Sequence, residues 1–107
     1  MADSLEIIRE LKNILTRKAG KDIKDVVLYG SQIRENKTAE SDYDILIVLN
    51  RIYKWPERRV IRDLCYEISL KYDIIIDSKI ISIQELQSTP NKYHPLYQDA
   101  LTKGIYA

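Results

Sequence analysis

The strongest fold signal in this 107-residue chain is the stretch LYGSQIRENKTAESDYDILIVL, residues 28–49. An apolar strand ends at Gly30-Ser31, a polar loop follows, and Asp42 and Asp44 open a second apolar strand. In an extended chain these two acids lie on one side with their Cα atoms about 6–7 Å apart, close enough to share a metal-binding region. A Gly-Ser turn after a strand offers free backbone N–H groups of the kind that hold phosphate. Together these features predict nucleotide chemistry.

Length and composition predict one globular domain over residues 1–107. A hydrophobic content of 45% with 31% charged residues is ordinary for a folded protein, which argues against disorder. The formal net charge is only +1, and the basic residues are spread along the chain. We therefore expect no general nucleic-acid binding, since that activity depends on a strong basic field.

The sequence also indicates a cellular compartment. The single cysteine, Cys65, excludes an intrachain disulfide framework, and its place on an apolar stripe predicts a core residue. The first residues lack the basic and then apolar pattern of a signal peptide. No apolar run approaches the roughly 20 residues that a membrane-spanning helix needs. We expect a cytoplasmic protein with no membrane association.

Hydrophobic periodicity predicts an α+β (mixed α/β) fold: a small mixed sheet of three or more strands with helices packed against it. The first helix has Asp3 or Ser4 as its N-cap and stops at Gly20. Pro56 suits the first turn of a second helix, and Ser82 with Glu85 resembles a capping box. The expected helices cover residues 5–19, 56–68 and 95–103, and a further short helix is expected to open at residues 82–85. The expected strands cover residues 25–29, 44–49 and 72–81.

A third acid can complete the site. Asp77 interrupts an isoleucine-rich strand, and Asp73 has the same parity about 13 Å further along. Parity does not choose between them. A charged residue in the middle of a strand calls for a functional explanation more than one at the start of a strand, so Asp77 is the better candidate. A carboxylate at Asp44, beside buried sheet, is costly to desolvate, and a metal ion would offset that cost. The alternative interpretation is an ordinary turn at Gly30 and a solvated loop end at Asp42.

The combined pattern resembles the signature of the nucleotidyltransferase superfamily that includes DNA polymerase β, and in particular its minimal, MNT-type members. Their pattern is Gly-Ser, ten residues, then Asp-x-Asp, and here Gly30-Ser31 is followed after ten residues by Asp42 and Asp44. The tail from His94 to Ile105 is similar to the ending of these small proteins. The family's loop arginine and the serine before its first acid match two further residues of the loop, Arg34 and Ser41.

The resemblance implies a mechanism. Two Mg²⁺ ions would be held by the acids Asp42, Asp44 and Asp77 together with the triphosphate of ATP. Asp77 would also help to deprotonate the acceptor hydroxyl, which attacks the α-phosphate. The nucleotide would be bound by residues of the turn and loop, namely Gly30, Ser31, Arg34 and Ser41, with Lys37 as an alternative source of positive charge.

Two residues depart from the family pattern. The glycine that commonly follows the loop arginine is Glu35 here, and the small residue before that arginine is Ile33. Both changes can alter the conformation of the loop and its affinity for the nucleotide.

The resemblance also implies a partner. Minimal members are commonly paired with a helical HEPN protein in toxin–antitoxin modules, in some systems transferring AMP onto a tyrosine of the toxin. We expect this activity here, because the short chain leaves no room for an acceptor-binding domain. The alternative, favoured by Glu35, is a catalytically weak or inactive binding subunit that neutralises its partner by contact alone. Transfer to a small molecule such as an aminoglycoside, or a purely structural role, accounts for less of the sequence.

Overall fold

The computed structural model describes residues 3–30, 42–88 and 90–107, and within them a mixed four-stranded sheet forms in the order β3-β2-β1-β4. β1 pairs antiparallel with β2 and with β4, whereas β2 and β3 are parallel. The predicted mixed sheet is therefore confirmed. The strands are β1 (Ile23–Tyr29), β2 (Tyr43–Leu49), β3 (Ile76–Ser82) and β4 (Ile105–Tyr106).

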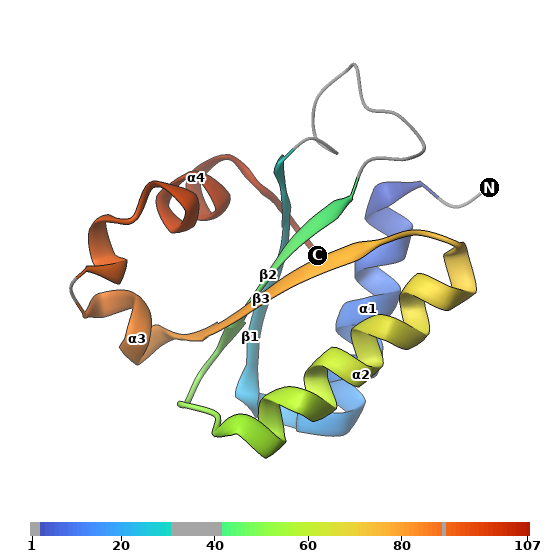
Figure 1. The fold of residues 1–107 in the computed structure, drawn as a ribbon, viewed down its shortest axis with the longest axis horizontal. Helices are drawn as coiled ribbons and strands as arrows, with labels where there is room; N and C mark the ends of the chain where they lie inside the picture. Colours follow the sequence, from blue (N-terminus) through green and yellow to red (C-terminus); the bar gives the residue numbers. More distant parts are fainter. Residues whose placement is uncertain (1–2, 31–41, 89) are drawn as a thin grey trace.

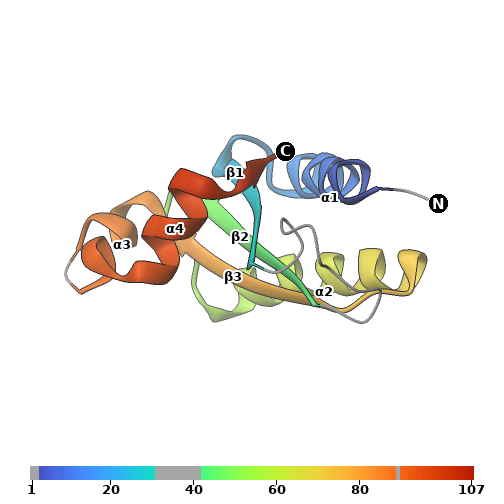
Figure 2. The same ribbon diagram turned by 90° about the horizontal axis from the view of Figure 1, so that it is seen from above.

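Helices cover both faces of this sheet (Figure 1). α1 (Ser4–Ala19) and α2 (Trp55–Tyr72) pack on one face, and α3 (Ile83–Gln87) and α4 (Pro95–Lys103) lie on the other, as the turned view in Figure 2 shows. Short 3₁₀ turns, η1 (Gly20–Asp22) and η3 (Asn91–Tyr93), precede β1 and α4. None of the helices in the described ranges is long and apolar enough to cross a membrane.

The central strand β2 explains why the sheet needs two covering layers. Its last five residues, from Ile45 to Leu49, are all buried. Ile45, Ile47 and Leu49 belong to the core under α1 and α2, whereas Leu46 and Val48 belong to a smaller core under α4. Each such side chain contributes about 1.5–3 kcal/mol on burial, so the apolar run predicted as a central strand anchors both layers.

The end signals of α1 were read correctly from the sequence. The Asp3 carboxylate accepts a hydrogen bond from the Glu6 backbone N–H at 2.9 Å, so Asp3 is the N-cap and Ser4 is the first helical residue. At the other end, Gly20 adopts φ +58° and its N–H donates to the carbonyl of Thr16. Glycine takes this positive φ without the steric cost that a side chain would bring.

The predicted boundary between α2 and β3 is wrong. The strand was expected to begin at Tyr72, but α2 continues through Tyr72, and β3 begins only at Ile76. Between them Asp73 caps the helix in the left-handed conformation, with φ +53° and ψ +51°. Asp is among the few residues that tolerate this region. Asp73 therefore does not lie on the strand or share a sheet face with Asp77.

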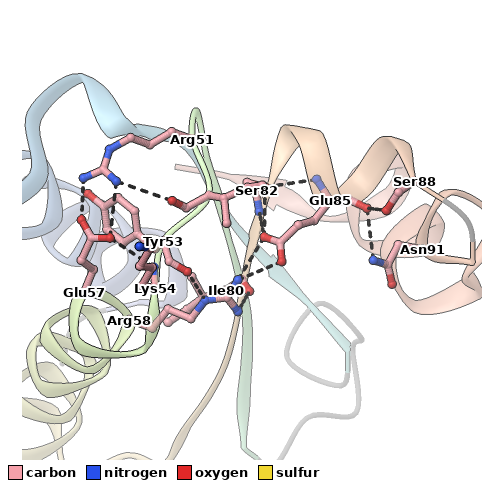
Figure 3. A network of polar contacts seen from close by, with 11 residues as sticks. Arg51, Tyr53, Lys54, Glu57, Arg58, Ile80, Ser82, Glu85, Ser88 and Asn91 are labelled. Carbon is pink, nitrogen blue, oxygen red and sulfur yellow. Dashed lines mark hydrogen bonds and ion pairs between the residues drawn. The ribbon is translucent and has the colours of Figure 1, made fainter.

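A polar network joins α2, β3 and α3 (Figure 3). The Arg58 guanidinium donates to the carbonyls of Tyr53 and Ile80 and to both carboxylate oxygens of Glu85. Glu85 also accepts from the backbone N–H of Ser82, while its own N–H donates to the Ser82 hydroxyl. The predicted capping box at Ser82 is thus confirmed, and it shares its carboxylate with an arginine from another helix.

The C-terminal segment closes the sheet. α4 runs from Pro95 to Lys103 as predicted, and the His94 side chain accepts a hydrogen bond from the Leu96 N–H at its start. Immediately after Gly104 the chain pairs with β1 as the short strand β4, which the sequence did not reveal. This pairing fixes α4 across the face that also carries the predicted acids.

Candidate active site

The in-register pairing of β2 with β3 places two of the predicted acids side by side. Asp44 is the second residue of β2, Asp77 is the second residue of β3, and the two are direct Cα partners in the parallel pair. Neighbouring strands lie about 4.8 Å apart, and paired residues point to the same face. Leu46 and Val48, which share the parity of Asp44, pack under α4. The two carboxylates therefore lie on the α4 face, beyond the end of its core.

Gly30 lies directly beside this pair. It follows Tyr29, the last residue of β1 and the register partner of Asp44. Its φ is +79°, and a Cβ built on it would collide with the Asp44 carboxylate. Glycine is therefore required for two reasons: its backbone conformation and the close approach of the carboxylate. The sequence predicted this glycine as a phosphate turn, and the structure adds that it makes room for Asp44.

Asp42 stands one residue before β2 and is exposed. It has the same parity as Asp44, as expected. Within residues 3–30, 42–88 and 90–107, however, no three Asp, Glu, His or Cys side chains are gathered closely enough to form a ready metal site. The structure therefore pairs Asp44 with Asp77, while Asp42 is exposed and acts on Asp44 through its negative charge.

The surroundings of Asp44 disfavour its negative charge. Burial raises the pKa of Asp44, and the negative charges of Asp77 and Asp42 raise it further, while the nearby Lys79 acts in the opposite direction. Lys79 lies two residues after Asp77, and its Nζ is 3.2 Å from an Asp77 carboxylate oxygen. Both side chains of this ion pair are nearly half exposed, so the pair adds little stability. The site therefore concentrates negative charge that a cation would relieve.

Tyr29 completes the described surroundings. Burial raises the pKa of its phenol to about 12, and the charges of Asp44 and Asp77 add to the effect. The hydroxyl therefore keeps its proton at neutral pH and adds no negative charge to the site. Tyr29 and Lys79 were both missed from the sequence. Their positions in the sequence could have revealed them. Tyr29 directly precedes Gly30, and Lys79 shares the strand parity of Asp77 because it is two residues further along.

The donor set fits magnesium. Mg²⁺ prefers oxygen ligands and is commonly bound by one or two carboxylates together with the phosphates of a substrate. Asp44 and Asp77 supply two carboxylates on one face of the sheet. The remaining predicted binding residues lie in residues 31–41, outside the described part of the chain: Ser31, Arg34, Ser41 and the alternative Lys37, together with the departures Ile33 and Glu35.

A cavity of about 270 Å³ lies elsewhere and does not serve this site. It is lined by Asp22, Arg51, Tyr53 and Glu57 among others, at the start of β1 and the end of β2. Arg51 pairs with both Asp22 and Glu57, and the Tyr53 hydroxyl also donates to Asp22. These polar groups satisfy one another, and the cavity is at the opposite end of the strands from Asp44.

Acids on neighbouring strands beside a glycine that admits no side chain suit an enzyme that transfers phosphate-containing groups with the help of hard cations. A family model described as "Polymerase beta, Nucleotidyltransferase" matches residues 9–99, and the chain belongs to this family. The resemblance inferred from the Gly-Ser and Asp-x-Asp pattern is confirmed, and with it the expected fold. The chain is a nucleotidyltransferase, an enzyme that transfers a nucleoside monophosphate.

Two proteins of Methanocaldococcus jannaschii are similar to this chain. "Putative protein adenylyltransferase MJ0604" is 38% identical over 79 residues, which make up 74% of this chain and 73% of the relative. "Putative protein adenylyltransferase MJ0141" is 35% identical over 72 residues, which make up 67% of this chain and 73% of the relative. No solved structure gives a significant match.

Proposed function

We propose that this protein transfers AMP from ATP, in a Mg²⁺-dependent reaction, to a hydroxyl on a partner protein. The observation that carries the proposal is the in-register pairing of Asp44 with Asp77 beside Gly30. The names of the two similar archaeal proteins support a protein as the acceptor. The partner we propose is a helical HEPN toxin, with this chain acting as its antitoxin and a tyrosine of the toxin as the acceptor.

The acids would bind the metal ions, and the turn at Gly30 would bind the phosphates. Asp44 and Asp77, joined by Asp42, would hold two Mg²⁺ ions through their carboxylate oxygens. When bound, these ions would neutralise charge on the triphosphate and on the leaving pyrophosphate. Gly30 would receive the phosphates at its backbone N–H. The loop residues proposed to bind the nucleotide with it are Ser31, Arg34 and Ser41.

The transfer itself exchanges one phosphorus–oxygen bond for another. The acceptor oxygen attacks the α-phosphorus, the bond between the α-phosphorus and the bridging oxygen breaks, and pyrophosphate leaves. The proton of the acceptor hydroxyl would pass to the Asp77 carboxylate, whose side chain is 48% exposed. Tyr29 stays neutral beside the acids and packs against α4. Such reactions depend chiefly on positioning and charge neutralisation.

Mass spectrometry of the acceptor tests this proposal. The candidate HEPN protein is incubated with this protein, ATP and Mg²⁺, and its intact mass is measured. We expect a mass increase of one or more AMP groups with the wild type and none with Asp44→Asn. Asp99→Asn is the matched control, because Asp99 is an exposed acid on α4 with one long ion pair to Lys103. A partner that binds but gains no mass would refute transfer to this acceptor.

Neutralisation by contact alone is the second candidate. One observation favours it: Asp42 is exposed and no three acids are gathered in the described residues. The two candidates differ in their response to Asp44→Asn. Transfer requires Asp44, so the variant would fail to protect cells from the toxin, whereas a contact inhibitor would still protect them.

A further inference from the structure

The outward face of α2 carries a stripe of side chains that are exposed in the described part of the chain. We define this α2 stripe as Trp55, Arg59, Arg62, Asp63, Tyr66 and Leu70. Trp55, Tyr66 and Leu70 are 67%, 63% and 64% exposed. Spacings of three and four residues place the stripe on one side of the helix. The buried residues Ile61 and Cys65 lie on the other side, against the sheet.

The middle of the α2 stripe holds charges of both signs. Arg59 and Arg62 are followed by Asp63, and all three are exposed. The Arg59 guanidinium carbon lies 5.7 Å from the centroid of the Trp55 ring, a cation–π contact. Within the described part of the chain, none of these three residues forms an ion pair. Exposed tryptophan, tyrosine and arginine side chains on one helix face match the composition of interface hot spots.

We propose that two copies of this chain associate through their α2 stripes, with the two helices antiparallel about a two-fold axis near Arg62 and Asp63. Inverting the stripe end for end places Trp55 near Tyr66 and Leu70 of the second copy. It also brings Arg59 and Arg62 within reach of Asp63 of the second copy. A two-fold interface requires a surface that is complementary to itself in this way. A parallel arrangement would instead place like charges together.

The length of α2 limits the size of the proposed interface. An 18-residue helix is about 27 Å long, and one helix from each copy gives an interface near the small end of stable sizes, about 1,200 Å² in total. We therefore expect a dimer with a dissociation constant in the micromolar range. The paired acids Asp44 and Asp77 lie on the opposite face of the sheet, beyond the end of the core under α4, so the proposed contact does not cover them. This inference is independent of the proposed acceptor.

Analytical ultracentrifugation over a concentration series tests the interface. The wild type is expected to shift from monomer to dimer as its concentration rises. Tyr66→Asp should raise the dissociation constant at least tenfold, because it introduces a charge into the contact. Tyr93→Asp is the matched control, since Tyr93 is 65% exposed but lies outside the stripe. A wild type that stays monomeric throughout, or equal behaviour of the two variants, would overturn the proposal.

Charge reversal gives a sharper test of the antiparallel geometry. Asp63→Arg makes the middle of the stripe entirely basic, and the double variant Arg59→Asp/Arg62→Asp makes it entirely acidic. Each is expected to be monomeric alone, and an equal mixture should form a heterodimer. Because these residues are exposed, circular dichroism melting should show that each variant remains folded. Homodimers of either variant, or no association in the mixture of folded variants, would contradict the assigned charge contacts.

Discussion

Replacing Gly30 with alanine tests whether the glycine exists to accommodate Asp44. The glycine has φ +79°, and an added Cβ would meet the Asp44 carboxylate. A non-glycine residue in the left-handed region costs about 1–2 kcal/mol, and forcing the carboxylate from its preferred rotamer costs about 0.5–1.5 kcal/mol more. We expect a loss of about 2–3 kcal/mol in the free energy of unfolding, which lowers Tm by on the order of 10 °C.

Gly20→Ala provides the matched control for this substitution. Gly20 also has a positive φ, +58°, but no atom lies within 4 Å of a Cβ built there. Gly20→Ala should therefore lose only the backbone component, about 1–2 kcal/mol, and should retain nucleotidyl transfer. Gly30→Ala should lose about 100-fold in transfer rate, because misplacing a catalytic group by about 1 Å has that effect.

Thermal denaturation and a transfer assay with radiolabelled ATP measure both consequences. Adding Asp44→Ala removes the carboxylate, whose atoms are the two nearest to the new Cβ, and leaves only the Cβ of residue 44 at 3.2 Å. In that background most of the extra cost of Gly30→Ala over Gly20→Ala should therefore disappear. The reasoning is refuted if Gly30→Ala matches Gly20→Ala in stability and also retains wild-type transfer.

Three further outcomes follow from the described structure. Burial and neighbouring carboxylates raise the pKa of Asp44, so its ionised form is disfavoured in the folded state. The free energy of unfolding therefore falls as the pH rises from the unfolded-state pKa to the raised folded-state pKa. Asp44→Asn should therefore be more stable than the wild type at pH 7, and chemical denaturation should show that difference vanishing below about pH 3.9; a less stable variant at pH 7 would contradict this. Arg58→Met leaves the part-buried Ile80 carbonyl without its hydrogen-bond donor. Urea denaturation should therefore show a loss of about 1–3 kcal/mol in the free energy of unfolding, while ATP binding persists. Burial raises the pKa of the Cys65 thiol to about 11, so the folded protein should resist thiol-specific reagents at pH 8 and react only after unfolding; fast labelling of the native protein would argue against the packing of α2.

Much of the fold could be predicted because local signals agreed with one another. The α1 helix has an Asp cap, an apolar stripe and a terminal glycine, and the apolar run after Asp44 is typical of a strand covered on both faces. The predicted start of the strand at Tyr72 was wrong because the isoleucines that follow favoured a strand, although the helical stripe continues from Ile68 to Tyr72. Asp73 was then counted by strand parity, although it ends the helix in the left-handed conformation.

The site was predicted in outline because the spacing of Gly30 from Asp42 and Asp44 is informative in itself. Strand parity predicts that Asp42 and Asp44 lie on one side, but sequence alone cannot give the register between β2 and β3. That register decides which third acid meets Asp44, and it pairs Asp44 with Asp77. The tertiary contacts were also invisible, including the approach of the Asp44 carboxylate to Gly30 and the short strand β4, whose two residues carry almost no periodicity.

The pairing of Asp44 with Asp77 as the centre of nucleotidyl transfer is the central claim, and two acids four residues apart test it most directly. Transfer of AMP from radiolabelled ATP, with Mg²⁺ and the acceptor present, is measured for the wild type, Asp77→Asn and Asp73→Asn in one experiment. We expect Asp77→Asn to lose at least about 100-fold in rate, and Asp73→Asn to stay within about twofold, since exposed side chains away from a site contribute little. Wild-type transfer by Asp77→Asn, or loss of transfer only in Asp73→Asn, would contradict the account.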